Sequence, residues 1–212
     1  YYVDANNLYS YPAIFTGMGM SAVIIQYCSE RVSEERKNAI YRHALLGGNG
    51  ANLLVAAAIA ALAYWQYSMG ETQTAFYLLL MCGLPFLNYA DTYAQTVLRV
   101  KLKNQVFSYA NTTYSIVLLL GNICLTKLFH VPGLIYSRYL AYLTATVICF
   151  TVMWKERFFG RIMGTKEYLG PDVRRQLNNY AFVCAITNFT STVLTLLDVT
   201  CLDLILKDPT VL

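Results

Sequence analysis

Charged residues are scarce in this chain of 212 residues. Asp, Glu, Lys and Arg make up only 13% of it, whereas apolar residues make up 57% and the mean hydropathy is +0.42. This composition excludes an ordinary soluble domain, in which about a quarter of the residues are charged. The sequence therefore predicts a protein that resides in lipid.

Sequence patterns typical of enzymes are also absent. The chain contains no HExxH, no GxSxG, no phosphate-binding glycine loop and no aspartate pair of the kind that binds magnesium and diphosphate. Asp198 and Asp203 are five residues apart, so on one helix their side chains point in directions that do not suit a shared metal ion. We therefore expect no enzymatic activity, no cofactor and no bound metal.

The cysteines form no CxxC pair, and no histidine lies near them at ligand spacing. All six occur singly within or at the ends of apolar segments, at Cys28, Cys82, Cys124, Cys149, Cys184 and Cys201. We interpret them as small apolar packing residues rather than as disulfide or metal partners.

Six apolar segments are long enough to cross a bilayer as helices, because a span takes about 20 residues. They cover residues 9–28, 40–67, 74–98, 106–129, 134–154 and 177–206. Residues 155–176 form the only long connection, which is basic and interrupted by glycines. The sequence therefore predicts an all-α polytopic membrane protein with about six transmembrane helices.

Positive charge is concentrated in three stretches, residues 31–42, 99–103 and 155–175, which hold 13 of the 16 Lys and Arg residues. Two apolar segments separate each stretch from the next, so single crossings place all three on one side. The positive-inside rule makes that side the cytoplasm. We expect a multi-pass protein of the inner (cytoplasmic) membrane, with both chain ends on the outer side. Because the charge is confined to loops, we expect membrane lipid and no nucleic acid as partner.

Polar side chains within spans are costly in lipid and should face protein or water. Arg42 lies seven residues before Asn49, on the same helix face, and either lines a path for an anionic substrate or marks the membrane boundary. Asp91 and Gln95 also share a face, which contacts either a neighbouring helix or a water-filled cavity. With Arg99 as a second cation, these residues are candidates for a substrate path.

Other residues are candidates for coupling or bending. Asp198 is the most deeply placed carboxylate, and it either pairs with a polar neighbour or binds a coupling proton or sodium ion. Gly47, Gly48 and Gly50 each cost about 1 kcal/mol relative to Ala in a helix, which close packing or a functional hinge would explain. Pro85 leaves the same two alternatives, a static kink or a hinge.

Three short segments, in this order, suggest a family. They are Gly17-Met18-Gly19-Met20-Ser21, then Gln26-Tyr27-Cys28-Ser29-Glu30, and late in the chain Leu194-Thr195-Leu196-Leu197-Asp198. Together with the topology, they resemble the polysaccharide (O-antigen type) flippases of the multidrug/oligosaccharidyl-lipid/polysaccharide exporter superfamily. In that family one helix ends in an "lGls" segment, and the helix that opens the second half carries Asp in an "llD" setting.

The resemblance implies two six-helix lobes around a cavity that opens alternately to either side of the membrane. Residues 1–154 would then form five spans of the N-terminal lobe, residues 155–176 a cytoplasmic interfacial linker, and residues 177–212 the first helix of the C-terminal lobe. The chain begins with Tyr1 rather than Met and has no signal peptide, so we expect it to be an internal piece of a longer protein.

The resemblance also implies a substrate, an undecaprenyl-diphosphate-linked oligosaccharide of the kind used for O-antigen and lipopolysaccharide. A flippase would turn this lipid across the membrane, and polysaccharide polymerases would be its protein partners. Asp198 matches the family's acidic position, whereas Arg42 and Arg99 are candidates for a cationic entrance on their chemistry alone.

Two alternatives remain open. A cation-coupled drug or metabolite antiporter of the same superfamily would need more acidic residues in the first lobe, where only Asp91 is a candidate. A non-transporting membrane scaffold would satisfy all its polar side chains between helices. If Arg42, Asn49, Asp91 and Asp198 all had partners in a dry core, a transport function would lose its physical support.

Overall fold

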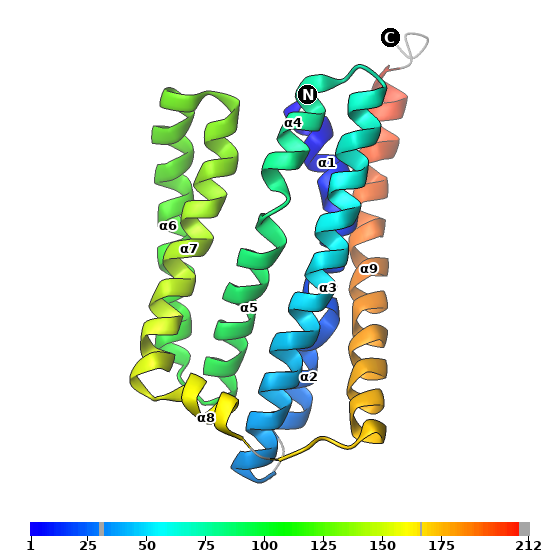
Figure 1. Cartoon of the computed structure of the whole chain (residues 1–212). Coiled ribbons are helices and arrows are strands. Elements are labelled where there is room, and N and C mark those ends of the chain that lie inside the picture. The colour runs from blue at the N-terminus through cyan, green and yellow to red at the C-terminus, as the bar shows by residue number, and fades with distance from the viewer. Residues whose placement is uncertain (30–31, 166, 208–212) are drawn as a thin grey trace.

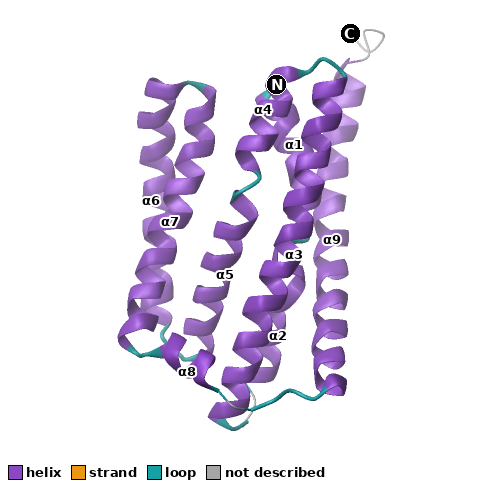
Figure 2. Cartoon of the chain, viewed as in Figure 1, coloured by secondary structure: helices purple, strands orange, loops and turns teal. Residues whose placement is uncertain are grey.

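The structure is a computed structural model that describes residues 1–29, 32–165 and 167–207, with side chains described as far as residue 194. All regular elements within these ranges are helices (Figure 2). They are α1 Tyr2–Ala13, η1 Thr16–Gly19, α2 Met20–Cys28, α3 Glu34–Ser68, α4 Thr72–Met81, α5 Leu84–Val100, α6 Asn104–Phe129, α7 Val131–Lys155, α8 Phe158–Gly164 and α9 Pro171–Lys207.

Four helical segments of the described chain are long and apolar enough to cross a membrane. They are Tyr2–Cys28, Glu34–Ser68, Asn104–Phe129 and Val131–Lys155. The chain is thus a helical protein with the features of a membrane protein. The predicted count of about six spans is not confirmed, because the segment at residues 74–98 is divided between α4 and α5, each shorter than a typical span.

The long helices lie side by side and roughly parallel to one axis (Figure 1). The α6–α7 hairpin forms one flank, α4 and α5 occupy the middle, and α3 follows with α1 and α2. At the other flank α9 packs against η1 and α2. The α5 helix contacts α2, α3, α6 and α7, so it is the element that joins the two halves of this arrangement.

The described residues of all three basic stretches lie at one end of the bundle, which we call the basic end (lower end in Figure 1). Glu156 holds two of these stretches together, because it pairs with Lys101 at 3.2 Å and also with Lys103. In α8, Phe158 is buried and its ring packs against Tyr41 of α3, with 5.4 Å between centroids. The N-terminus and the last turn of α9 lie at the opposite end.

Local sequence explains where α3 begins at the basic end. The Ser33 hydroxyl accepts a hydrogen bond from the Arg36 amide at 3.3 Å, as an N-cap does. Glu34 and Glu35 follow in the first turn, where acidic side chains interact favourably with the helix dipole. The next turns of α3 carry Arg42 and His43, which lie on the side of the helix that faces the linker and α9.

Two expected spans are interrupted near their middle. Between α1 and α2 the backbone takes positive φ at Gly17, Met18 and Gly19. Between α4 and α5 the break falls at Cys82 and Gly83, and Pro85 then occupies the first turn of α5. Inside lipid such breaks are tolerated only where protein satisfies the freed backbone groups.

Candidate functional site

A polar hollow of about 450 Å³ lies at the basic end, between α3 and the segment that leads into α9. Arg42 and His43 of α3 contribute to one wall, and Arg174 from the first turn of α9 contributes to another. Glu167 and Tyr168 of the linker complete the polar lining. Two guanidinium groups thus face a single carboxylate, and the hollow has a cationic character.

Contacts between α3, α9 and the linker hold the walls of this hollow. The imidazole Nε2 of His43 lies 2.8 Å from the Asn178 amide oxygen, so it donates a hydrogen bond across to α9. The guanidinium of Arg174 lies over the Tyr168 ring, 4.6 Å from its centroid, in a cation–π contact. Arg42 is exposed and makes no hydrogen bond or ion pair with the described residues. Its guanidinium therefore remains available to an anion.

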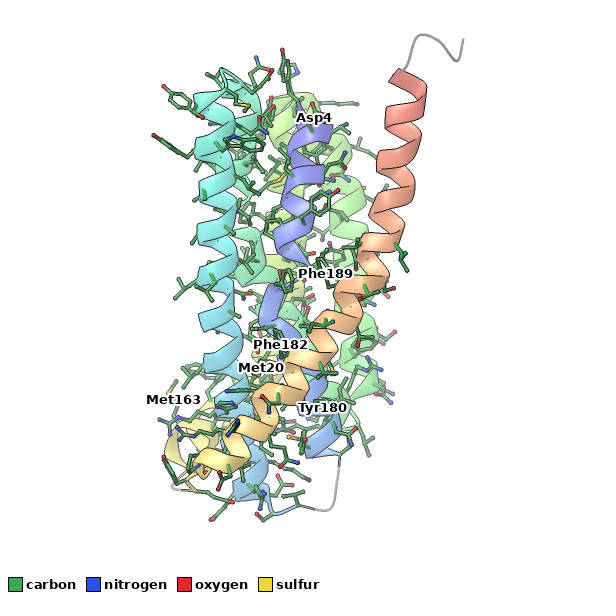
Figure 3. All side chains as sticks on the ribbon, turned by 90° about the vertical axis from the view of Figure 1, so that its right-hand side faces the viewer. Asp4, Met20, Met163, Tyr180, Phe182 and Phe189 are labelled. Atoms are coloured by element: carbon green, nitrogen blue, oxygen red, sulfur yellow. The ribbon has the colours of Figure 1, made fainter. Side chains whose placement is uncertain are left out.

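An apolar hollow of about 470 Å³ lies farther along α3, between α3, the α1–η1 segment and α9. The Phe189 ring of α9 stacks on that of Phe15 at 5.4 Å, where α9 passes the break between α1 and α2 (Figure 3). The residues that line this hollow are Tyr11, Pro12, Phe15, Met18, Ala51, Leu54, Val55, Ala58, Leu62 and Phe189.

The two hollows follow one another along α3. Leu46 lines the polar hollow and Ala51 lines the apolar one, and five residues of helix span only about 7.5 Å. Between them a Cβ placed on Gly50 would meet no atom within 4 Å, so this part of α3 is uncovered. A cationic surface and an apolar surface are therefore continuous on the α3 flank.

Arg42 is the one predicted substrate-path residue that lines the polar hollow. Asn49 instead donates from its amide nitrogen to the Leu45 carbonyl of its own helix, at 2.8 Å. Asp91 and Gln95 bond one another within α5, also at 2.8 Å, and line neither hollow. The structure therefore does not bring these candidates together at one place.

Two candidates remain, the cation Arg99 and the carboxylate Asp198. The Arg99 guanidinium is exposed and stacks over the Phe107 ring, 5.2 Å from its centroid. The helix α9 includes position 198, but the Asp198 side chain falls outside the described residues. Full pairing in a dry core would have argued against transport. Neither Arg42 nor Asp91 meets this condition, since Arg42 has no polar partner among the described residues and the Asp91 Oδ1 has no hydrogen-bond partner among them.

The glycines considered as hinges lie in a continuous helix, because α3 runs unbroken from Glu34 to Ser68. Gly47 and Gly48 are packing positions in this structure: a Cβ on Gly47 would press on Met20, and one on Gly48 would overlap the Tyr89 ring. The Tyr89 hydroxyl donates to the Ala44 carbonyl at 2.6 Å and so fixes the ring in that place. Whether Gly47, Gly48, Gly50 or Pro85 acts as a hinge stays a prediction.

Asn52, which is not among the predicted site residues, connects the two helix breaks. It is fully buried; its amide oxygen accepts a hydrogen bond from the Gly17 N–H at 2.8 Å, and its amide nitrogen donates to the Pro85 carbonyl at 3.2 Å. Gly17 lies in the first break, and Pro85 lies in the first turn of α5, directly after the second break. A single side-chain amide thus bonds the backbone at both breaks, and an Asn deep in an apolar run was the available signal.

Charge at the basic end is closely spaced. Burial lowers the pKa of the Lys101 ammonium from its ordinary value, and the nearby cations Arg161 and Lys103 act in the same direction. Two carboxylates offset this repulsion: Glu156 forms ion pairs with both lysines, and the charge of Glu34 acts on Lys101 in the opposite direction to these cations. Among the described residues, no group of three His, Cys, Asp or Glu could hold a metal ion, and the five described cysteines are free.

Comparison with protein-family models, with curated proteins and with solved structures found no match for this chain. Its function is therefore argued from the two hollows and from the distribution of charge.

Proposed function

We propose that this chain is part of a membrane transporter that turns a lipid-linked oligosaccharide across the cytoplasmic membrane. The observation that carries the proposal is the succession of a cationic hollow and an apolar hollow along α3. A polyprenyl-diphosphate sugar has the same succession of parts, a doubly anionic headgroup followed by a long hydrocarbon chain.

The polar hollow suits the diphosphate. Guanidinium groups bind phosphate oxygens through paired, charge-assisted hydrogen bonds, and the hollow offers one from Arg42 and one from Arg174. The Glu167 carboxylate faces the same space and would favour a bound group that also carries hydroxyls, as a sugar does. The exposed phenol of Tyr168 offers a surface on which a sugar ring can stack.

The apolar hollow suits the first isoprene units of the lipid. Its lining is almost wholly carbon, from Phe15, Leu54 and Phe189 among others, and it is continuous with the uncovered flank of α3. An isoprenyl chain is stabilised by about 0.8 kcal/mol for each CH₂ group removed from water, and this holds for an apolar protein surface as it does for a bilayer. The hollow would therefore guide the chain at little cost.

The proposed orientation follows from the charge. With the basic end in the cytoplasm, the polar hollow opens at the inner leaflet, where such lipids are assembled. About six spans and a second lobe, expected from the family resemblance, would enclose the other side of the path. The drug antiporter and the scaffold remain the alternatives that an experiment has to separate.

The test is export of a lipid-linked glycan by the full-length protein in cells, with binding of undecaprenyl diphosphate to the purified protein measured alongside. Arg42→Ala should weaken binding about 10-fold, since a charge-assisted hydrogen bond contributes about 1.5 kcal/mol. Arg175→Ala is the matched control, because Arg175 is exposed in the same helical turn as Arg174 and lines neither hollow.

A second pair of variants examines the apolar hollow. Ala58→Trp would fill the hollow, whereas Ala57→Trp places the same ring on the exposed side of α3, outside the lining. We expect export to fall in the first variant and to stay near the wild-type rate in the second. Equal export by Arg42→Ala, Ala58→Trp and their controls would refute the assignment of the substrate path. Normal insertion with no glycan export by any form would favour the scaffold.

A further inference from the structure

Two buried polar side chains without full hydrogen bonding lie on α5 and α7, outside the lining of both hollows. Asp91 is only 6% exposed, and its Oδ1 has no hydrogen-bond partner among the described residues. Thr146 is equally buried, and its hydroxyl also lacks a partner within the described chain. Unpaired polar atoms in an apolar interior are costly, so each such group calls for an explanation.

The register of α5 and α7 brings the two residues to the same level. Both helices run toward the basic end (Figure 1), where Lys101 pairs with Glu156. Asp91 lies ten residues before Lys101, and Thr146 lies ten residues before Glu156. Since both helices rise about 1.5 Å per residue, the two polar side chains are at about equal height.

The facing sides of the helices agree with this placement. Tyr139 of α7 reaches across to the junction of α4 and α5: its hydroxyl donates to the Leu80 carbonyl in the last turn of α4 at 2.8 Å, and it lies close to Gly83, which precedes α5. Thr146 follows Tyr139 by two helical turns and so lies on the same face. Cys149, one turn farther along, is within electrostatic range of Asp91. Asp91 and Thr146 therefore belong to one interface.

Little around Asp91 can stabilise a negative charge. Its other oxygen accepts one hydrogen bond, from the Gln95 amide. The exposed Arg99 is about 12 Å farther along α5. The titratable groups of the surrounding core are neutral at pH 7 by their ordinary pKa values: Cys28 of α2, Tyr41 of α3, Tyr89 and Tyr93 of α5, and Cys149 of α7. The described parts of α6 and η1 contribute no titratable group to this core.

We propose that Asp91, with Thr146 beside it, is a proton-binding site between α5 and α7. A proton taken up by the carboxylate oxygen gives a neutral carboxylic acid and a new O–H donor, and the Thr146 hydroxyl at the same level of α7 is an acceptor without a partner among the described residues. Burial favours this neutral form when no cation lies nearby. The oxygens of Asp91, Gln95 and Thr146 are too few for a hard metal cation, which takes about six. Release of the proton would leave an unpaired charge between the helices and so loosen their packing.

The direct test needs no transport substrate. Infrared difference spectra of the full-length protein in lipid, titrated from about pH 4 to pH 8, report the carboxylic-acid C=O stretch. We expect a signal at neutral pH that is lost in Asp91→Asn and kept in Asp172→Asn, an exposed aspartate of α9 that serves as control. Spectra of wild type and Asp91→Asn that match at neutral pH would overturn the proposal.

Two milder variants keep the test decisive if Asp91→Asn does not fold. Gln95→Leu removes the donor that favours the charged carboxylate, so the midpoint of the titration should move to higher pH. Thr146→Val removes the hydroxyl at nearly constant volume and should shift the frequency of the C=O band. An unchanged midpoint and an unchanged frequency would both count against the site.

A second arm rests on the proposed function. If proton binding is linked to transport, Asp91→Asn should remove the dependence of glycan export on an imposed pH gradient, while Asp172→Asn should retain it. Failure of export in every form, together with a normal infrared titration, would reject the flippase but keep the proton site. If the infrared signal is the same in wild type and in Asp91→Asn while export is normal, the proton site is rejected and the flippase is kept.

Discussion

Replacing Asn52 should test whether one side chain holds the two helix breaks together. In Asn52→Ala the Pro85 carbonyl loses its donor, which costs about 1 kcal/mol, near the average for hydrogen bonds between membrane helices. The Gly17 N–H loses its acceptor in a buried place, which costs about 1 to 3 kcal/mol more. The free energy of unfolding should therefore fall by about 2 to 4 kcal/mol.

The matched control is Asn49→Ala, one turn earlier on the same helix. The Asn49 side chain bonds only the Leu45 carbonyl of α3 itself, which keeps its helical partner when the side chain is removed. Its loss should change stability by less than about 0.5 kcal/mol. Asn52→Asp separates the two contacts, because it can still accept from Gly17 but can no longer donate to Pro85.

Thermal or denaturant unfolding of the full-length protein in detergent or lipid measures these differences. Hydrogen exchange at Gly17 and its neighbours gives an independent readout, since the amide loses its acceptor only in Asn52→Ala. Equal losses in Asn52→Ala and Asn49→Ala, with unchanged exchange at Gly17, would refute the idea that Asn52 joins the breaks.

Two further predictions concern packing and charge. Gly48→Ala should destabilise the fold by about 1 to 3 kcal/mol, because the added Cβ would overlap the Tyr89 ring. In the control Gly50→Ala the Cβ meets no atom, so the free energy of unfolding should rise by up to about 1 kcal/mol. Equal melting temperatures of the two variants would contradict this prediction. Glu156→Gln should lower the free energy of unfolding by about 1 to 2 kcal/mol, because it leaves Lys101 and Lys103 unpaired at the basic end. Glu34→Gln breaks an exposed pair with Lys37 and should lower it by less than about 0.5 kcal/mol. If the difference between the two variants is the same in high salt, its cause is not electrostatic.

The helical class and the positions of the long segments could be predicted because they depend on local composition. Segments expected at residues 40–67, 106–129 and 134–154 lie inside α3, α6 and α7, whose apolar runs are long enough to fold as helices wherever they pack. The expected span at residues 74–98 shows the limit of such reasoning. Its hydropathy is continuous, but the helix is divided at Cys82 and Gly83, where Tyr139 of α7 bonds the Leu80 carbonyl and Asn52 of α3 bonds the Pro85 carbonyl.

The candidate site could be predicted only in part. Arg42 was identified from its place at the start of an apolar run, which is a local property. Arg174 and Tyr168 come together with it only because the linker returns to α3, across more than a hundred residues of chain. Asp91 was assigned to a substrate path from the polar stripe it shares with Gln95, whereas the structure turns that stripe toward α7.

By itself, the sequence determined that this chain is helical and apolar, and that its positive charge lies in every second loop between the apolar segments. These properties follow from the hydropathy and charge of each segment alone. The tertiary structure decided which of its polar groups have partners. Asn52 is satisfied because two broken helices meet at it, and Arg42 is free because α9 leaves a hollow beside it. Asp91 is left half-satisfied because α7 covers it without supplying a cation. Such outcomes depend on which helix packs against which, and that is set by the whole chain rather than by any one segment.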